Sequence, residues 1–490
     1  MLMTRRPGWA DLYAIQVDRT DGTPLFRQIY AQMRSAILQR TLRPGTKLPS
    51  TRDLAGRLSV SRNAVVAAYE QLLAEGYASG KIGAGTYIAA DFPEPFVGAP
   101  PRKKRTPPGR TGAQLPRSLE VLDVTTQDDA SPFNLGRTLI DGRTAALWRR
   151  LTARSLRIFN PRHLGYSNPQ GMPQLCSQIC DYLRAARAVR CEPAQVMVTA
   201  GTQQAIDLVI RFLGGDEKHV WVEDPGYPLT RQALVAAGAT VHPVPVDENG
   251  IDVAQGNRLA PHACAVFVTP SHQFPTGVQL SMPRRLELLA WARDAGAWIV
   301  EDDYASEFRY GGRPLASLQG LDEEERVIYI GTLNKALFPG LRLGYAVLPH
   351  ALVRPFVTAR YLIDRQPSTL LQSMVADFMG EGHFTSHLRR TRAAYREQRD
   401  ALVSALQRRL GGHLIAEPPD QGMHLVAYGR RGLCDVAIER AARAQGVVVR
   451  AMSRMYAVAP ARSALMFGFS GYPPRTMGPA VARLARVFER

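Results

Sequence analysis

A stretch rich in proline, glycine and basic residues interrupts this 490-residue chain between residues 91 and 130. Its sequence, DFPEPFVGAPPRKKRTPPGRTGAQLPRS, shows neither the alternation of a strand nor the period of a helix. Such a stretch predicts a linker and excludes a single continuous core, for which the chain is in any case too long. We therefore predict one domain over residues 20–90 and a larger one over residues 131–490.

The charge and the cysteines narrow the class of protein. A net charge of +18 indicates a polyanionic partner, with nucleic acid as the first candidate, although a basic enzyme from an arginine-rich proteome would share it. The five cysteines form no CxxC pair and no zinc spacing, so we expect reduced thiols in the cytoplasm and no metal site. No apolar run suits a membrane span or a secretion signal.

Residues 20–90 carry the pattern of three helices followed by a hairpin. Apolar residues recur at helical spacing from Leu25 to Leu38. Ser50 or Thr51 can cap a second, short helix, and Ser61 can cap a third. The glycine-rich sequence GYASGKIGAGTYIA that follows predicts the hairpin.

Two short helices joined by a tight turn are typical of a helix-turn-helix, whose second helix reads the major groove with its N-terminal residues. Arg62 and Asn63 occupy that position. The alternative is a three-helix unit in which these side chains are merely exposed. The sequences LPSTRDLAGRLSVSRNAVVAAYEQLLAEGY and GAGTYI, however, closely resemble the winged helix-turn-helix domain of the GntR regulator family over residues 24–89.

That resemblance implies double-stranded DNA as a partner and DNA contacts from the following residues: Arg52, Ser61, Arg62 and Asn63. Arg52 suits a phosphate, and Arg62 suits a phosphate or a guanine edge. One departure is Arg40, where the family usually has glycine at the end of the first helix.

Residues 131–490 alternate short apolar runs with amphipathic helical patterns, which indicates a largely parallel α/β sheet. Ligands of such sheets gather at the carboxyl ends of strands. Four of the runs are followed there by polar groups, which are Gly201-Thr202-Gln203, Ser271-His272-Gln273, Asp302-Asp303-Tyr304 and Lys335.

These groups match the needs of pyridoxal 5'-phosphate (PLP), which takes a lysine, an acid at its pyridine nitrogen, phosphate donors and an aromatic neighbour. Lys335 and Asp302 can supply the first two, Gly201–Gln203 with Arg342 the phosphate site, and Tyr227 the aromatic ring. Taken singly, each motif is weak evidence, because a DDY after a strand is more often an ordinary loop and Tyr227 is compatible with a core residue.

The sequences EDPGYP, TPSHQFPTG, EDDYASEFRY and GTLNKALFPGLRLGY resemble fold-type I aminotransferases, and most of all the MocR-like branch of the GntR family. That branch joins a winged helix-turn-helix to an aminotransferase-like domain. The resemblance implies that Lys335 is the Schiff-base lysine, that Asp302 or, failing it, Asp303 pairs the pyridine nitrogen, and that Tyr304 bonds the ring hydroxyl. It also implies that Tyr227 borders the ring and that the phosphate is held by Gly201, Thr202, Gln203 and Arg342.

Some positions depart from the enzymes of this fold. Phe274, Asn334 and Ala305 replace an asparagine, a serine and an acid, and no arginine stands just ahead of the FGF near the C-terminus, where a substrate carboxylate would bind. Arg462 is the nearest candidate for that role. These departures favour a regulator over an efficient enzyme.

The expectation is therefore a multidomain PLP-dependent transcription regulator that acts on a DNA operator as a homodimer, arranged head-to-tail if it follows the branch that it resembles. Its effector is PLP itself or an amine or amino acid such as γ-aminobutyrate or taurine, as the resemblance allows. The alternatives are an active aminotransferase carrying a DNA-binding domain, and a DNA-binding protein whose second domain has lost its cofactor and serves only for dimerisation.

Overall fold

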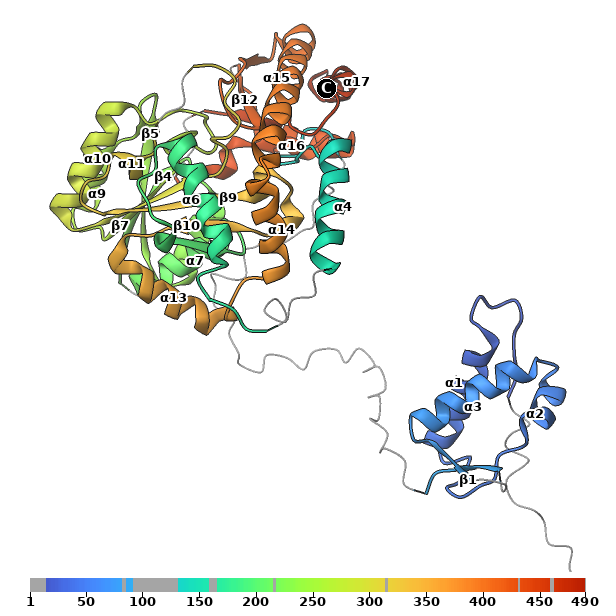
Figure 1. Ribbon diagram of the computed structural model, residues 1–490. Helices are drawn as coiled ribbons and strands as arrows, with labels where there is room; N and C mark the ends of the chain where they lie inside the picture. The colour runs from blue at the N-terminus through green and yellow to red at the C-terminus, as the bar shows by residue number, and fades with distance from the viewer. Residues whose placement is uncertain are drawn as a thin grey trace, which may run out of the picture. The chain divides into compact units, whose positions relative to one another are not determined.

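The computed structural model describes residues 15–81, 85–90, 131–157, 165–214, 217–312, 316–430, 432–458 and 462–489. The chain separates into two compact units, Met1–Ala113 and Gln114–Arg490 (Figure 1). The predicted linker over residues 91–130 lies outside the described residues. Among the described helices, none is long and apolar enough to cross a membrane.

The N-terminal unit has the predicted three helices and hairpin. Its elements are α1 (Leu25–Leu38), α2 (Thr51–Leu58), α3 (Arg62–Ala74), β1 (Ala78–Lys81) and β2 (Gly85–Ile88). The two strands pair antiparallel, and α1 and α3 pack against each other. Their buried apolar residues, among them Ile29, Met33, Val65 and Leu72, form a core of this unit alone.

Local hydrogen bonds explain where these helices begin and end. Ser50, and not Thr51, caps α2 by accepting from the Asp53 amide at 3.1 Å. Ser61 caps α3 by accepting from the Ala64 amide at 3.3 Å. Between the two helices Ser59 has a φ of 53°, which turns the chain sharply. Arg40 also has a positive φ, 58°, so it takes a conformation that glycine adopts more readily.

The larger unit contains an eight-stranded sheet in the order β3-β10-β9-β8-β7-β4-β5-β6. The strands are β3 (Val196–Thr199), β4 (His219–Asp224), β5 (Thr240–Asp247), β6 (Gly250–Ile251), β7 (Ala265–Val268), β8 (Trp298–Asp303), β9 (Val327–Thr332) and β10 (Gly344–Val347). Strands β9, β8, β7, β4 and β5 run parallel, as the sequence predicts for most of the sheet. Strand β10 is antiparallel to both of its neighbours, β3 and β9, and β6 is antiparallel to β5.

Helices cover both faces of this sheet (Figure 1). Alternate residues of one strand face opposite cores, so that Val196 and Val198 pack with α6, whereas Met197 packs with α7. The described helices of this unit are α4 (Gly142–Arg157), α6 (Pro173–Arg187), α7 (Thr202–Leu213), α8 (Pro228–Ala236), α9 (Val253–Leu259), α10 (Met282–Ala295), α11 (Leu318–Leu321), α12 (Leu333–Ala336), α13 (His350–Asp364), α14 (Thr369–Gly380), α15 (His383–Leu410), α16 (Asp435–Ala444) and α17 (Pro474–Phe488).

A second, antiparallel sheet lies in the C-terminal part of the unit in the order β11-β12-β14-β13. Its strands are β11 (Leu414–Ala416), β12 (His424–Gly429), β13 (Arg450–Ala451) and β14 (Ala464–Gly468). The long helix α15 packs on α17 and on β11 (Figure 1).

The topology brings several loops to one edge of the large sheet. Because β3, β9, β8, β7 and β4 point the same way, their carboxyl ends lie together. The antiparallel β10 begins at that same edge, so the residues just before it join the loops that follow the other strands.

Candidate functional site

Asp302 and Tyr304 come from the end of β8 and have buried polar atoms with no hydrogen-bond partner among the described residues. These atoms are Asp302 Oδ1 and the Tyr304 hydroxyl. Burial, together with the nearby Asp303 and Glu223 carboxylates, raises the pKa of Asp302 to about 7. Burial also holds the pKa of Tyr304 well above its usual value. A buried polar atom without a partner is costly, so the pair is suited to a polar ligand.

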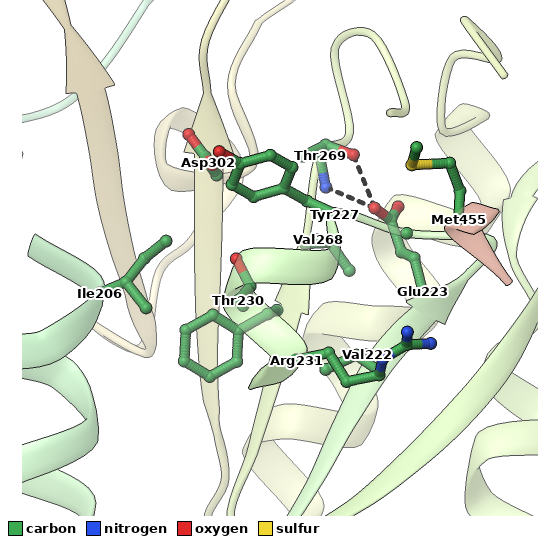
Figure 2. A pocket seen from close by; sticks show the side chains of 12 residues that line it. Ile206, Val222, Glu223, Tyr227, Thr230, Arg231, Val268, Thr269, Asp302 and Met455 are labelled. Atoms are coloured by element: carbon green, nitrogen blue, oxygen red, sulfur yellow. Dashed lines mark hydrogen bonds between the residues drawn. The ribbon is translucent and has the colours of Figure 1, made fainter. Parts of the chain in front are cut away.

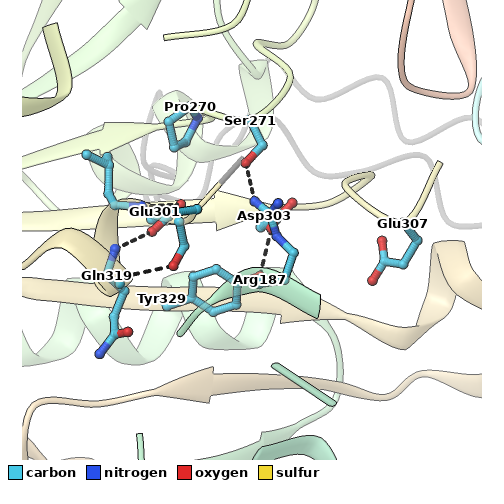
Figure 3. Close-up of polar contacts among 12 residues, drawn as sticks. Arg187, Pro270, Ser271, Glu301, Asp303, Glu307, Gln319 and Tyr329 are labelled. Carbon is cyan, nitrogen blue, oxygen red and sulfur yellow. Dashed lines mark hydrogen bonds and ion pairs between the residues drawn. The ribbon is translucent and has the colours of Figure 1, made fainter. Parts of the chain in front are cut away.

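Asp303, the next residue in the chain, has a different environment (Figure 3). Its Oδ2 accepts from Arg187 Nε at 2.8 Å and from the Tyr329 hydroxyl at 2.7 Å. Arg187 also donates to the Ser271 hydroxyl. Asp303 is therefore held in a buried ion pair, whereas one oxygen of Asp302 is left for another partner.

Lys335 lies in α12, directly after β9. The segment before α4 closes over it, because a Cβ added to Gly136 would come 2.3 Å from the Lys335 Nζ. His424 of β12 is also close, since burial and, more weakly, Lys335 lower its pKa. The small sheet thus contributes a buried histidine within electrostatic range of the lysine, which the sequence analysis did not identify.

Gly201, Asn334 and Arg342 meet at the sheet edge. A Cβ on Gly201 would lie 2.9 Å from Asn334 Nδ2 and 3.8 Å from Arg342 Nη1. Asn334 also accepts from the Leu343 amide at 3.0 Å, which ties the Lys335 turn to the start of β10. Glycine suits position 201 because its φ is 102° and the space beside it is taken.

Thr202 and Gln203 form the first turn of α7, which Gly201 precedes. Gly201 is buried, Thr202 is half-buried and Gln203 is exposed. An N-terminus of this kind presents backbone N–H groups that suit an anion. Arg342 is exposed and stands just before β10, so its guanidinium lies next to this helix start.

Aromatic rings form a further wall of the site. Phe274 packs edge-on against Tyr227 with centroids 5.5 Å apart, and against Tyr304 at 6.1 Å. Tyr227 is 39% exposed. Tyr227 and Asp302 line a pocket whose walls also include Glu223 and Met455 (Figure 2).

Two buried residues near this wall were not assigned any role from the sequence. Glu223 accepts from the Thr269 amide and hydroxyl at 3.1 and 2.6 Å (Figure 2), and burial raises its pKa to about 7. His272 has both ring nitrogens buried without a partner in the described part of the chain, and burial lowers its pKa to about 3. The motifs EDPGYP and TPSHQFPTG contained both residues, but only their packing distinguishes them from loop positions.

Arg462 lies just before β14 and is exposed, with its guanidinium 4.0 Å from the centre of the Tyr428 ring. The described contacts do not join it to Lys335 or Asp302. Ala305, by contrast, is fully buried, so the acid usual at that position would need a partner inside the core.

The residues predicted to contact DNA belong to the other unit. Arg52, Arg62 and Asn63 are exposed at the starts of α2 and α3. The Arg62 Nε donates to the Thr51 hydroxyl at 3.3 Å, so the first turns of the two helices are linked. Ser61 uses its hydroxyl to cap α3 and thereby fixes the start of that helix.

Two family models match the chain. Residues 25–88 match the bacterial regulatory proteins of the gntR family, and residues 141–484 match the aminotransferases of class I and II. Among solved structures, LysN, an α-aminoadipate aminotransferase from Thermus thermophilus, is similar with a TM-score of 0.67 and 27% identity. The likeness covers 74% of this chain and 92% of that one.

Full-length relatives combine both parts. The chain is 38% identical to the probable rhizopine catabolism regulatory protein MocR of Rhizobium meliloti, over 96% of this chain and 95% of that protein. It is 32% identical to the pyridoxine biosynthesis regulator PdxR of Corynebacterium glutamicum, over 97% and 98%, and 32% identical to the regulator TauR of Rhodobacter capsulatus, over 94% and 96%. The chain therefore belongs to the MocR-type transcriptional regulators, in which a GntR-family DNA-binding domain is joined to a class I and II aminotransferase domain.

Proposed function

We propose that this protein binds an operator through its N-terminal unit and senses PLP, or an amino compound together with PLP, through its aminotransferase domain. One observation carries the cofactor part of this proposal. Asp302 Oδ1 and the Tyr304 hydroxyl are buried, without partners in the described structure, at the sheet edge where Lys335 also lies.

The residues at this edge fit PLP. The Asp302 carboxylate would accept a hydrogen bond from the protonated pyridine nitrogen, and that cationic partner would offset the burial that raises the pKa of Asp302 to about 7. Asp303 is already engaged by Arg187, which supports Asp302 rather than Asp303 for this role. The Tyr304 hydroxyl would donate to the oxygen on the ring, and Tyr227 would border the ring.

The phosphate would lie beside Gly201. The backbone N–H groups of Thr202 and Gln203 in the first turn of α7 and the guanidinium of Arg342 are suited to its oxygens. Lys335 would bind the aldehyde carbon as a Schiff base. When bound, PLP supplies an electron sink for the carbon next to an amine. Within the chain, Lys335 would hold or release a proton there, and His424 stays neutral beside it because burial lowers its pKa.

An effector amine would compete with Lys335 for the same carbon and so release the lysine. A ligand shifts the equilibrium between two conformational states of a protein by binding one of them more tightly. If the two states differ in operator affinity, such a shift is enough to change DNA binding. Arg462 is our candidate for an effector carboxylate, such as that of γ-aminobutyrate. The relative named as a regulator of pyridoxine biosynthesis supports PLP itself as one candidate effector.

We further propose a homodimer, head-to-tail in its arrangement, that places two winged domains on two half-sites. Dimeric readers of this kind match the symmetry of their sites, and the segment at residues 91–130 would set the reach. Such a regulator acts in the cytoplasm.

The test is an operator-binding assay with full-length protein, with and without PLP and a panel of amines. We expect DNA affinity or half-site spacing to change when PLP or one amine is added, and the change to be absent in Lys335→Ala. DNA binding that stays the same for every ligand would refute the sensing role. The intact set of Lys335, Asp302 and Arg342 keeps an active aminotransferase as the second candidate, which a turnover assay separates.

A further inference from the structure

A second cleft lies between the end of α6, the loop after β8 and helix α15. Among the described residues, its lining has no member in common with that of the pocket at Tyr227 and Asp302. Its described walls include Tyr182 and Arg187 from α6, Glu307 from the loop, and Gln421 from the segment before β12. The site described above does not account for it.

The cleft is strongly basic. Five arginines line it in addition to Arg187, and they are Arg184, Arg309, Arg389, Arg392 and Arg396. Glu307 is the one acidic residue among the described residues of the lining. So many cations around one space repel each other unless an anion lies among them.

The hydrogen bonds of these arginines leave their charges uncompensated. Arg184 donates to the Cys191 carbonyl at 2.8 Å and Arg392 to the Glu307 carbonyl at 3.0 Å. Arg396 donates to the Tyr310 carbonyl. These acceptors are neutral backbone oxygens, which hold the side chains in place without pairing their charge.

Buried polar atoms without partners line the same cleft. Gln421, which is 4% exposed, accepts from Arg309 Nη1 at 3.2 Å through Oε1, so its Nε2 donor is turned elsewhere. That Nε2 and the Arg309 Nε both lack a partner in the described structure. Glu307 is 6% exposed, its Oε2 has no partner there either, and burial raises its pKa to about 7, so it also donates when protonated.

We propose that this cleft binds a compact anion that carries phosphate or carboxylate groups, such as a phosphorylated metabolite or a polycarboxylate. Within the described structure, two donors without acceptors and five arginines without carboxylate partners all call for the oxygens of one ligand. Gln421 and Glu307 are more than nine-tenths buried, which favours a small anion over the backbone of duplex DNA. The ligand would be separate from the phosphate of PLP.

The experiment uses full-length protein and isothermal titration calorimetry with pyrophosphate and with citrate, at constant ionic strength in chloride buffer. At least one of these probes should bind once per chain. Gln421→Leu and Arg392→Gln should each weaken it by about tenfold or more, since each removes a donor or a charge. Arg408→Gln, an exposed substitution on the same helix as Arg392, should leave it unchanged.

Additional variants and controls show whether the anion binds in this cleft. Arg392→Lys, which retains the charge, should weaken the probe less than Arg392→Gln does. If Arg392→Gln does not fold, the tenfold loss expected for Gln421→Leu tests the cleft. Binding that is lost in Arg342→Ala, but not in the cleft variants, would assign the probe to the PLP phosphate site and overturn the proposal. The proposal would also be overturned if neither probe bound. It would be overturned again if Arg389→Gln lost operator affinity in the absence of any anion, because the cleft would then be a DNA-binding surface. Because the calorimetric readout needs neither PLP nor DNA, failure of the anion site can be distinguished from failure of the proposed function.

Discussion

Arg187 Nε lies 2.8 Å from Oδ2 of Asp303, and this buried ion pair distinguishes two adjacent carboxylates that are chemically identical. One carboxylate is paired inside the protein, and the other keeps an oxygen without a partner among the described residues. Opposite consequences of the same substitution at the two positions follow from this difference.

Asp302→Asn should stabilise the cofactor-free protein at pH 8 and weaken its hold on PLP. The folded-state pKa of Asp302, about 7, lies above the unfolded value, so its carboxylate destabilises the fold once it is ionised. The gain in the free energy of unfolding of Asp302→Asn over the parent should be absent below about pH 4 and grow as the pH rises. It should reach roughly 2–4 kcal/mol at most above pH 7. Urea unfolding at pH 4, 6 and 8, with PLP titrations, measures both effects.

Asp303→Asn is the matched comparison and should instead destabilise the protein at neutral pH. It leaves the buried Arg187 without its counter-ion, which costs about 3–5 kcal/mol when such a pair is broken. If Asp303→Asn were the more stable variant and Asp302→Asn bound PLP like the parent, the two roles would have to be exchanged.

Lys335→Ala should remove the yellow absorbance band that the parent shows with PLP, and borohydride should no longer attach the cofactor to the chain. The exposed Lys218 offers a control, since Lys218→Ala should keep both signals. Mass spectrometry of peptides after reduction locates the modified lysine. A cofactor mass on another lysine in the parent would reject our choice of site.

Arg62→Ala should weaken operator binding by about 1–3 kcal/mol and relax the choice of base at one position, if Arg62 reads a base edge. Arg62 is exposed in the first turn of α3, at the end of the helix that would enter the groove, and its hydrogen bond to Thr51 holds its side chain there. Arg27→Ala, on α1, is the control. Binding measured on a set of operator variants gives the result, and identical profiles for parent and variant would move the recognition surface elsewhere.

Arg52→Ala should weaken binding evenly across sequences and lower the slope of log affinity against log salt by about one, as for a single phosphate contact. Titrations at several salt concentrations measure the slope. A change in base preference instead of slope would show that Arg52 reads sequence.

Turnover should be slow or absent when the protein is given amino donors, PLP and a keto-acid acceptor. Transfer requires the substrate carboxylate to be held so that its Cα–H bond faces the lysine, whereas the guanidinium of Arg462 is exposed and lies over the Tyr428 ring. The measurement is the rate of new amino acid formed. A rate of about 1 per second or faster, with no effect of any donor on DNA binding, would favour the enzyme.

The parts that the sequence predicted best are those set by local interactions. Ser61 caps α3 through its own backbone neighbour, and the apolar residues of α1 fall on one face, so the winged unit could be read directly. Asp302 and Asp303 could not be separated in this way, because a shift of one residue exchanges the two faces of a strand. The ion pair that separates them depends on Arg187, which is 116 residues away in the chain.

Contacts between residues far apart in the chain explain the other features that the sequence analysis did not predict. Strand β10 has four residues and follows a turn rich in glycine, so nothing in its own pattern shows that it runs antiparallel between β3 and β9. His424 belongs to the second sheet and yet feels the charge of Lys335, and the arginines of the basic cleft come from separate segments. Each of these groups becomes a site only when the chain is folded.

The antiparallel course of β10 also makes the Lys335 and Arg342 region a single hairpin, β9–α12–β10, inserted between β3 and β8. Both stems of this hairpin are hydrogen-bonded to other strands, so its tip cannot tilt without breaking ladders on two sides. The positions of Lys335 and Arg342 relative to each other are therefore fixed by the two strands of this hairpin. Inserting or deleting a residue between them would displace both at once, so their separation along the chain is as constrained as their identity.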